Sequence, residues 1–447
     1  MLDLTEKNLN KNIFKLGIPV LIENLLHMSV FISDTIMVGR LGTDGIAAVG
    51  LAGTVFFVIS MVFSSLNVGT SSIIARHIGA KEKEIARVVG AQSILMSLIM
   101  GIFITPFLVL YAGNILVLMS AEPHITELGQ SYLQIVGGFL IFRLIILSCS
   151  GILRGVGDTK SPMKVTLIIN CTNILFNWLL IFGVGPFPKL GISGVAWATA
   201  IAYIVGTFLL CGKLFTGRCV LHIHILSVAR IHIESVRRIV RISLPAAIDA
   251  ILTQSGFLFF TKIVTILGTV PLAAHQIAVR IESISFMPGF AFAVSTATLV
   301  GQSLGAKNVE LARVSIRRNA TFALILMGIF ALVFLVFPVQ MARVFNPEPS
   351  VFSLAVACVM IAAIEQPALA IYMVYAGGLR GAGDTISPMI ITIVGTLCFH
   401  VPVSYLFGIT LGWGLTGVWF GSALDWILRA IAIYILFKRG RWKSINV

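Results

Sequence analysis

Charged residues are scarce in this 447-residue chain. Asp, Glu, Lys and Arg make up 11% of it and hydrophobic residues 57%, whereas a soluble domain averages about 25% charged residues. This composition excludes a soluble globular protein and indicates an integral membrane protein. The formal charge of +14 would suggest nucleic-acid binding in a soluble chain. Here the positive residues lie in loops, so we expect no nucleic-acid partner.

Several motifs are also missing. The six cysteines show no CxxC spacing and no close pairing, so they are interpreted as ordinary thiols. No GxxxxGK[ST] phosphate loop occurs, which disfavours an ATP-driven pump. His222, His224 and His232 have no carboxylate or cysteine arranged with them, so no metal site is predicted there. The polar N-terminus shows no cleavable signal peptide. We expect neither an enzyme nor a cofactor.

What the chain does contain is a repeated unit. The residues LRGVGDTKSPM at 153–163 recur as LRGAGDTISPM at 379–389, an offset of 379 − 153 = 226. Shorter pieces recur at the same offset: Gly79-Ala80-Lys81 and Gly305-Ala306-Lys307, Leu41-Gly42-Thr43 and Leu267-Gly268-Thr269, Pro19 and Pro245. The chain is therefore interpreted as two copies of one unit.

Each copy contains six apolar stretches long enough to cross a bilayer, which takes about 20 residues. They are 13–39, 46–76, 84–111, 124–151, 162–183 and 191–214, then 236–266, 272–303, 310–338, 350–377, 388–408 and 414–437. The predicted fold is an all-α membrane protein with twelve transmembrane helices in two six-helix lobes, related by pseudo-two-fold symmetry along the membrane normal. The predicted lobes are 1–215 and 236–447, joined by a cytoplasmic linker, 216–235.

Lys and Arg concentrate in the even-numbered loops and in both tails. By the positive-inside rule, both termini are expected to be cytoplasmic. The multi-pass chain is expected to lie in the plasma membrane, which is the inner membrane of a two-membrane cell.

The repeated turn follows the fourth span of each copy. Its glycines allow backbone conformations closed to other residues, and Ser161 before Pro162 is interpreted as a helix N-cap. Arg154 is expected to bond the carbonyls that end the preceding helix, with Asp158 answering it. We interpret Arg154, Asp158 and their equivalents Arg380 and Asp384 as structural.

The doubled unit and the paired turns resemble the multidrug and toxic compound extrusion (MATE) transporters of the bacterial or archaeal, NorM/DinF-like type. So do Ser285-Phe286-Met287-Pro288 and the stretch VGQSLGA at 300–306. The resemblance covers the chain from Pro19 to about Trp419. It implies two lobes facing a central cavity, alternating access, and export of organic cations against Na⁺ or H⁺.

Polar residues at membrane depth mark a candidate coupling site. Asp34 lies about 9 Å below the outer end of the first span, at 1.5 Å per residue. Asn173 and Asn177 are one helical turn apart on span five. Thr199 lies about 13 Å below the outer end of span six. Oxygen ligands suit a small cation such as Na⁺, and a buried carboxylate suits a proton, although the two amides could instead bridge helices.

The resemblance indicates the same positions. An aspartate fifteen residues after a span-one proline belongs to the family's cation site, and here 34 − 19 = 15. The family has a second aspartate where this chain has Asn177, so the site carries one formal charge instead of two. Pro19 is the predicted hinge, letting the first span bend when Asp34 changes charge.

The second copy lacks this cluster. Asp34 maps to Phe260 and Asn173 to Phe399 at the offset of 226. Its possible functional acids are Glu365, one helical turn from the position that the resemblance indicates, and Asp249. Either acid could instead form a structural pair with Arg280 or Lys262.

The predicted function is secondary active export of amphipathic or cationic organic compounds against H⁺ or Na⁺ by a monomer in contact with membrane lipid. The alternative is a lipid-linked-oligosaccharide flippase of the same superfamily. Methionine and aromatic side chains suit promiscuous cationic ligands. The candidate cavity residues are Met28, Met37, Phe257, Phe259, Phe260, Phe286, Met287 and Phe290.

Overall fold

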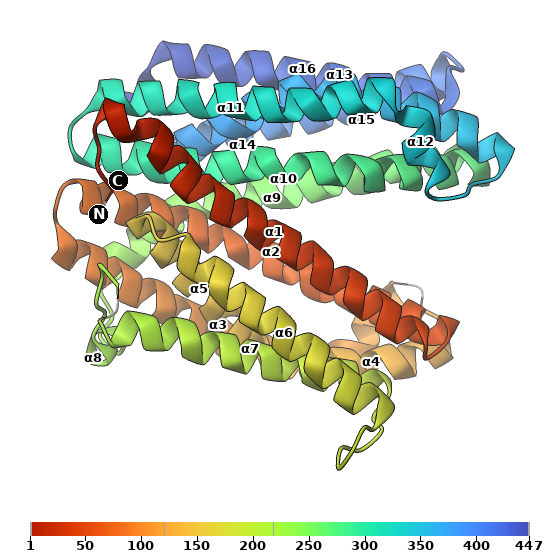
Figure 1. The fold of residues 1–447 in the computed structure, drawn as a ribbon, viewed down its shortest axis with the longest axis horizontal. Coiled ribbons are helices and arrows are strands. Elements are labelled where there is room, and N and C mark those ends of the chain that lie inside the picture. Colours follow the sequence, from red (N-terminus) through yellow and green to blue (C-terminus); the bar gives the residue numbers. More distant parts are fainter. Residues whose placement is uncertain (1, 120, 218, 446–447) are drawn as a thin grey trace. The chain divides into compact units, whose positions relative to one another are not determined.

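The computed structural model describes residues 2–119, 121–217 and 219–445, and this part of the chain is helical with no β-strand (Figure 1). Residues 1, 120 and 446–447 of the predicted lobes, and linker position 218, lie outside the described residues. The elements are η1 (Glu6–Asn8), α1 (Leu9–Gly39), α2 (Thr43–Gly79), α3 (Lys83–Leu118), α4 (Pro123–Gly138), α5 (Leu140–Val156), α6 (Lys160–Phe182), α7 (Ile192–Phe215), α8 (Ile225–Val228), α9 (Ile233–Ile266), α10 (Thr269–Gly305), α11 (Val309–Val336), α12 (Pro338–Arg343), α13 (Pro349–Gly381), α14 (Ile386–Val394), η2 (Gly395–His400), α15 (Val401–Tyr405), η3 (Leu406–Thr410), α16 (Gly414–Arg439) and η4 (Arg441–Ser444).

Twelve membrane spans are confirmed, with one refinement. Eleven of the described helices are individually long and apolar enough to cross a bilayer, and α4 with α5 forms a twelfth span bent by 50°. The predicted span 124–151 is thus broken at Phe139, directly after Gly137 and Gly138. Adjacent glycines are a common cause of helix kinks.

Span eleven is irregular. Two π-helical segments, η2 and η3, interrupt the α-helix formed by α14 and α15. Such segments are rare and occur mostly at functional sites. The equivalent span of the first copy, α6, is α-helical throughout.

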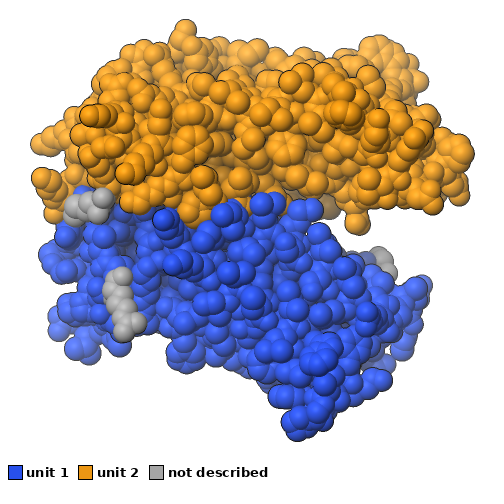
Figure 2. All heavy atoms as spheres, in the orientation of Figure 1, with its two compact units in different colours: residues 1, 22–78, 82–241 blue, residues 2–21, 79–81, 242–447 orange. Residues whose placement is uncertain are grey.

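The chain forms two compact units, coloured separately in Figure 2. Unit 1 contains residues 22–78 and 82–241, and unit 2 contains 2–21, 79–81 and 242–447. Helix α1 therefore passes from unit 2 to unit 1 at Ile22, three residues after Pro19. Helix α9 makes the opposite passage at Ile242, three residues before Pro245.

The repeated turns have the same geometry in both units. Gly157 and Gly383 both have φ of 91°, a left-handed conformation that glycine adopts without strain. The next amide closes the turn: Asp158 N donates to Leu153 O at 2.8 Å, and Asp384 N donates to Leu379 O at 2.8 Å. This pattern is a Schellman motif.

The N-cap prediction for Ser161 was wrong. Helix α6 begins at Lys160, and Asp158 supplies the capping oxygen, because Ser161 N donates to Asp158 Oδ1 at 3.1 Å and Ser161 Oγ donates to Oδ2 at 2.7 Å. Ser387 bonds Asp384 in the same way at 3.0 and 2.7 Å. A carboxylate accepts from both donors at once and forms stronger hydrogen bonds than a hydroxyl does.

Partial burial alone would raise the pKa of Asp158. Hydrogen bonds from Lys213 and Ser161 outweigh it and hold this pKa below its usual value. Lys213 Nζ lies 2.7 Å from Asp158 Oδ2, so the turn is also tied to the end of α7.

Each turn arginine pairs with an acid on the first span of its own copy of the repeat. Arg154 Nη2 lies 2.9 Å from Glu23 Oε2, and Arg380 pairs with Asp249. The acids are equivalent in the repeat, since 249 − 23 = 226. Both carboxylates are buried. These pairs support the structural interpretation of the turns.

The linker is held to unit 1. Gln92 on α3 donates through Nε2 to Arg230 O at 2.7 Å and accepts from His232 N through Oε1 at 3.0 Å. His222 Nε2 contacts Phe215 O at 2.7 Å. His232 Nδ1 lies 3.0 Å from Ser235 Oγ, so both imidazoles have partners within the fold.

Candidate functional site

The four residues predicted for the coupling site lie together in unit 1. Asp34 of α1 accepts a hydrogen bond from Asn177 Nδ2 of α6 at 2.6 Å. Asn177 Nδ2 also donates to Asn173 Oδ1 at 3.0 Å, and Asn173 Nδ2 donates to Thr199 Oγ1 of α7 at 3.2 Å. A continuous chain of polar contacts thus joins three helices that are far apart in the sequence.

The amides are buried and Asp34 is half-buried. Asn173 and Asn177 face the same side of α6 because they are one turn apart. Thr199 keeps its orientation by donating to Val195 O at 3.0 Å within its own helix. The same contacts also fit the other interpretation of the sequence, in which the two amides bridge helices and no ion is bound.

Aromatic residues that sequence reasoning missed surround this cluster. Tyr132 of α4 and Tyr203 of α7 are within electrostatic reach of Asp34. The Arg143 guanidinium lies 5.4 Å from the centre of the Tyr203 ring. The cluster therefore combines one carboxylate, that of Asp34, with the neutral oxygens of amide and hydroxyl side chains.

One oxygen of the cluster has no partner. Asn177 Oδ1 is buried and forms no hydrogen bond. A buried unpaired acceptor costs roughly 1–3 kcal/mol. It would be satisfied by a proton on Asp34 or by a small cation, and a sodium ion prefers oxygen ligands of this kind. The donor set therefore fits either coupling ion.

The two candidate acids of unit 2 have different surroundings. Asp249 pairs with Arg380, the structural partner described above. Glu365 of α13 is almost fully buried and accepts from Ser422 Oγ of α16 at 3.3 Å. Its other oxygen, Oε1, forms no hydrogen bond, and the charge of Glu282 on α10 reaches it. Glu365 thus keeps the features of a possible ion site, whereas Asp249 is held by an arginine.

The candidate cavity residues are spread over both units. Met28, Met37, Phe286 and Met287 are half-buried, and Phe257 is exposed. Phe259 lines a groove of about 550 Å³ between α9 and span eleven. Phe260 is 5% exposed and packs among His275, His400 and Trp419 in the core of unit 2.

The sequence analysis did not identify three buried ionisable residues, Glu23, Asp425 and Arg429, although the sequence contains signals for them. Glu23 and Asp249 each follow a repeated proline by four residues, which marks them as one position of the repeat. Asp425 and Arg429 stand four apart within the apolar run of span twelve, the spacing of a helical ion pair. In the structure they form that pair.

A family model described as MatE matches residues 19–179 and 245–406, one segment in each copy of the repeat. The chain is 30% identical over 437 residues to a probable multidrug resistance protein NorM of Thermotoga maritima. That alignment covers 98% of this chain and 94% of the relative.

Solved structures are similar over almost the full length. A crystal structure of MATE in the bent conformation superposes with a TM-score of 0.91 at 26% identity, covering 98% of this chain and 96% of that one. A structure described as the outward-facing conformation of a multidrug resistance MATE family transporter of the MOP superfamily gives a TM-score of 0.89 at 26% identity, with coverage of 98% and 96%.

Proposed function

Since the chain belongs to the MatE family, we propose that it is a multidrug efflux transporter that exports small organic compounds by antiport against H⁺ or Na⁺. Its relatives are named as multidrug resistance proteins, which supports small organic substrates and argues against the flippase alternative. We assign it to the plasma membrane as a multi-pass monomer with both termini cytoplasmic, in contact with lipid. The Lys and Arg content of the even-numbered loops supports this orientation.

The observation that carries the proposal is the polar chain from Asp34 to Thr199. Its carboxylate can take up a proton, and its oxygens, including the unpaired Asn177 Oδ1, can bind a sodium ion instead. In either case the ion changes the charge of a group at membrane depth. Such a change can favour one conformation over another only if the two conformations hold the ion differently.

Helix α1 links that change to the rest of the molecule. Asp34 lies on α1 in unit 1, while residues before Ile22 on the same helix belong to unit 2. Pro19 lies within one turn of this passage. Proline removes one helical hydrogen bond and weakens the helix locally, so we assign the bend to this point. Bending there would move Asp34 relative to the first turns of the helix.

Glu365 is the candidate for an additional role in unit 2. A buried acid with one unpaired oxygen can attract a cationic substrate. The apolar and methionine-containing residues Met28, Met37, Phe257, Phe286 and Met287 remain our candidates for contact with the substrate. Their soft, aromatic surfaces suit cations of varied shape.

The test is efflux of an organic cation dye from proteoliposomes under an imposed ΔpH or an imposed ΔNa⁺, each applied alone. Dye movement against its own gradient under either driving force supports the proposal and identifies the ion. Counterflow of labelled dye without any gradient checks transport as such. Failure of the purified, monodisperse protein to move dye in all three assays would refute an exporter of such cations.

A further inference from the structure

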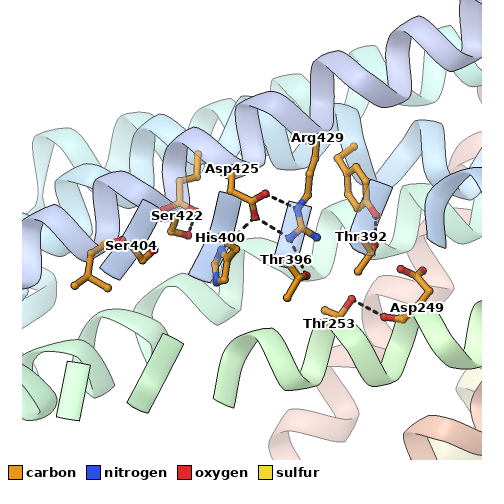
Figure 3. Close-up of polar contacts among 12 residues, drawn as sticks. Asp249, Thr253, Thr392, Thr396, His400, Ser404, Ser422, Asp425 and Arg429 are labelled. Carbon is orange, nitrogen blue, oxygen red and sulfur yellow. Dashed lines mark hydrogen bonds and ion pairs between the residues drawn. The ribbon is translucent and has the colours of Figure 1, made fainter. Parts of the chain in front are cut away.

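Unit 2 contains a second buried polar cluster, formed by spans eleven and twelve (Figure 3). Asp425 of α16 is 0% exposed. Both of its oxygens contact Arg429, with Nε 2.9 Å from Oδ1 and Nη2 2.8 Å from Oδ2. Arg429 Nη2 also donates to Thr396 Oγ1 of η2 at 3.1 Å. The ion pair is therefore complete and carries no net charge.

The arginine is fixed in place by its neighbours. Its guanidinium lies 4.9 Å from the centre of the Trp426 ring. It packs directly on Gly395, the first residue of η2, where a Cβ would collide with the guanidinium. The π-helical segment η2 thus places Gly395, Thr396 and His400 against the same side of α16, where Asp425 and Arg429 lie.

His400 is the third ionisable member of the cluster. Its Nδ1 lies 3.1 Å from Asp425 Oδ2, the oxygen that Arg429 Nη2 also contacts. The ring stacks on Phe260 at 5.0 Å with an interplanar angle of 25°. Gly256 of α9, the helix that carries Phe260, faces the same place, because a Cβ at this position would lie 3.1 Å from Thr396 Cγ2 and 3.9 Å from His400 Cδ2. The imidazole is 5% exposed and directed at a charged carboxylate.

The other titratable groups near His400 come from three helices. Asp425 and Arg429 face it from α16. His275 of α10 contacts the same Phe260 ring, with 5.4 Å between the ring centres. Glu365 of α13 is within electrostatic reach of Asp425 and bonds Ser422, one turn before Asp425. Among these groups, histidine is the side chain type that changes charge most readily near neutral pH.

The position of the cluster follows the repeat. Phe260 is the equivalent of Asp34, and it contacts span eleven at His400 just as Asp34 contacts span five at Asn177. Thr396 is the equivalent of Asn170, since 396 − 226 = 170. In unit 1 the carboxylate stands on the first span. In unit 2 an apolar ring takes that place, and the carboxylate stands on the sixth span of the copy.

We propose that His400, Asp425 and Arg429 form a second proton-binding site, in which His400 accepts a proton while Arg429 keeps Asp425 ionised. The inference rests on the proposed function and adds a coupling group to it. Proton uptake converts a cluster of net charge zero into one of net charge +1, with the new charge 3.1 Å from a carboxylate oxygen. A gain in folding stability does not explain three ionisable groups at this place, because a buried ion pair is often no more stabilising than apolar packing.

A groove of unit 2 borders the ion pair of the cluster. A groove of about 320 Å³ along spans eleven and twelve is lined by Gly395, Phe399, Asp425 and Arg429 and extends to Arg439 at the end of α16. Arg439 is about 21 Å from Asp425 along the helix at 1.5 Å per residue. The groove thus borders Asp425 and Arg429, the ion pair beside His400.

The experiment counts protons exchanged per dye molecule. Proteoliposomes containing the full-length protein are clamped at zero membrane potential with valinomycin and equal potassium, and an ethidium gradient is balanced against ΔpH until net flux stops. Each proton exchanged per ethidium changes the balancing dye ratio about tenfold per pH unit. We expect His400→Gln to lose about one such factor relative to wild type. His275→Gln is the matched control, a buried histidine on the same Phe260 with no acid beside it, and should keep the wild-type balance.

A second variant distinguishes loss of the proton site from loss of folding. The double change Asp425→Asn with Arg429→Gln keeps the pair neutral and similar in volume, and should lose the same factor because the proton on His400 has no carboxylate. Wild-type balance in folded His400→Gln overturns the second site, as does an equal loss in His275→Gln. If ethidium in wild type responds to ΔNa⁺ but not ΔpH, the second proton site is also refuted. If it responds to neither, the proposed export function itself fails.

Discussion

Replacing Asp34 by Asn tests the coupling site most directly. The change keeps the size of the side chain and removes its ability to ionise. Asp34 Oδ1 now accepts from Asn177 Nδ2 at 2.6 Å, while Asn177 Oδ1 has no partner. The new amide can donate to that oxygen, so we expect Asp34→Asn to fold and insert normally.

The expected functional loss is large. A hydrogen bond to a charged group is worth roughly 1.5–3 kcal/mol, which corresponds to about a ten- to hundredfold change in ion affinity. A proton cannot be held at all, because an amide does not titrate near neutral pH. Coupled dye efflux in Asp34→Asn should therefore disappear under both ΔpH and ΔNa⁺.

The matched control is Glu23→Gln, the other buried acid of α1. Glu23 pairs with Arg154 instead of with amides, so its replacement should lower thermal stability and leave ion dependence intact. Both variants are compared at equal expression, with gel filtration and thermal denaturation as folding checks. Wild-type efflux in Asp34→Asn would refute the reasoning, and loss of coupling in a stable Glu23→Gln would relocate the site on α1.

Asn173→Ala should weaken ion-driven efflux about ten- to hundredfold, because it removes the link between Asp34 and α7. Glu365→Gln should change dye affinity more than ion dependence, and the reverse pattern in the same vesicles would place coupling in unit 2. Arg154→Ala should destabilise the protein by about 3–5 kcal/mol, because a buried acid loses its partner. Denaturation scans should show this loss, and reduced dye affinity in a fully stable variant would contradict it. Asp158→Asn should lower the thermal midpoint at neutral pH. The pKa of Asp158 is depressed, so its stabilisation is present above the usual carboxyl range and fades as pH falls through the folded value. A difference from wild type that grows in acid would be inconsistent with this.

The second proton site changes how the asymmetry of the repeat is interpreted. By sequence, the second copy loses the polar cluster, since Phe260 and Phe399 replace Asp34 and Asn173. In the structure, spans eleven and twelve bring together the ionisable residues His400, Asp425 and Arg429. If both sites bind protons, the two halves contribute to coupling by different chemistry at equivalent spans.

Much of the fold was determined by the sequence alone. Span number follows from apolar length, since a bilayer sets how many residues a helix needs. The offset of 226 divides the chain into two six-span copies without any coordinates. The grouping of Asp34, Asn173, Asn177 and Thr199 was also predictable, because residue depth along each span can be counted at 1.5 Å per residue.

Only the tertiary structure decided the partners of the buried charges. Counting gives depth but not which face of a helix meets which neighbour. The sequence therefore left Asp249 open to Arg280 or Lys262, whereas it pairs with Arg380, which is 131 residues away. The N-cap of α6 was assigned to Ser161 for a related reason, whereas Thr159 occupies the N-cap and Asp158 supplies the capping oxygen. Helix ends vary by one or two residues until the capping bonds are seen.

The tertiary structure alone also placed His400 beside Asp425. His400 ends the first π-helical segment, η2, and α15, the second π-helical segment η3 and a turn lie between it and α16, which carries Asp425. A π-helical segment changes the angle between successive side chains, so the periodicity of an ordinary α-helix gives the wrong face for every residue beyond it. Sequence determined that polar residues lie within the membrane, and the irregular helix decided which of them meet.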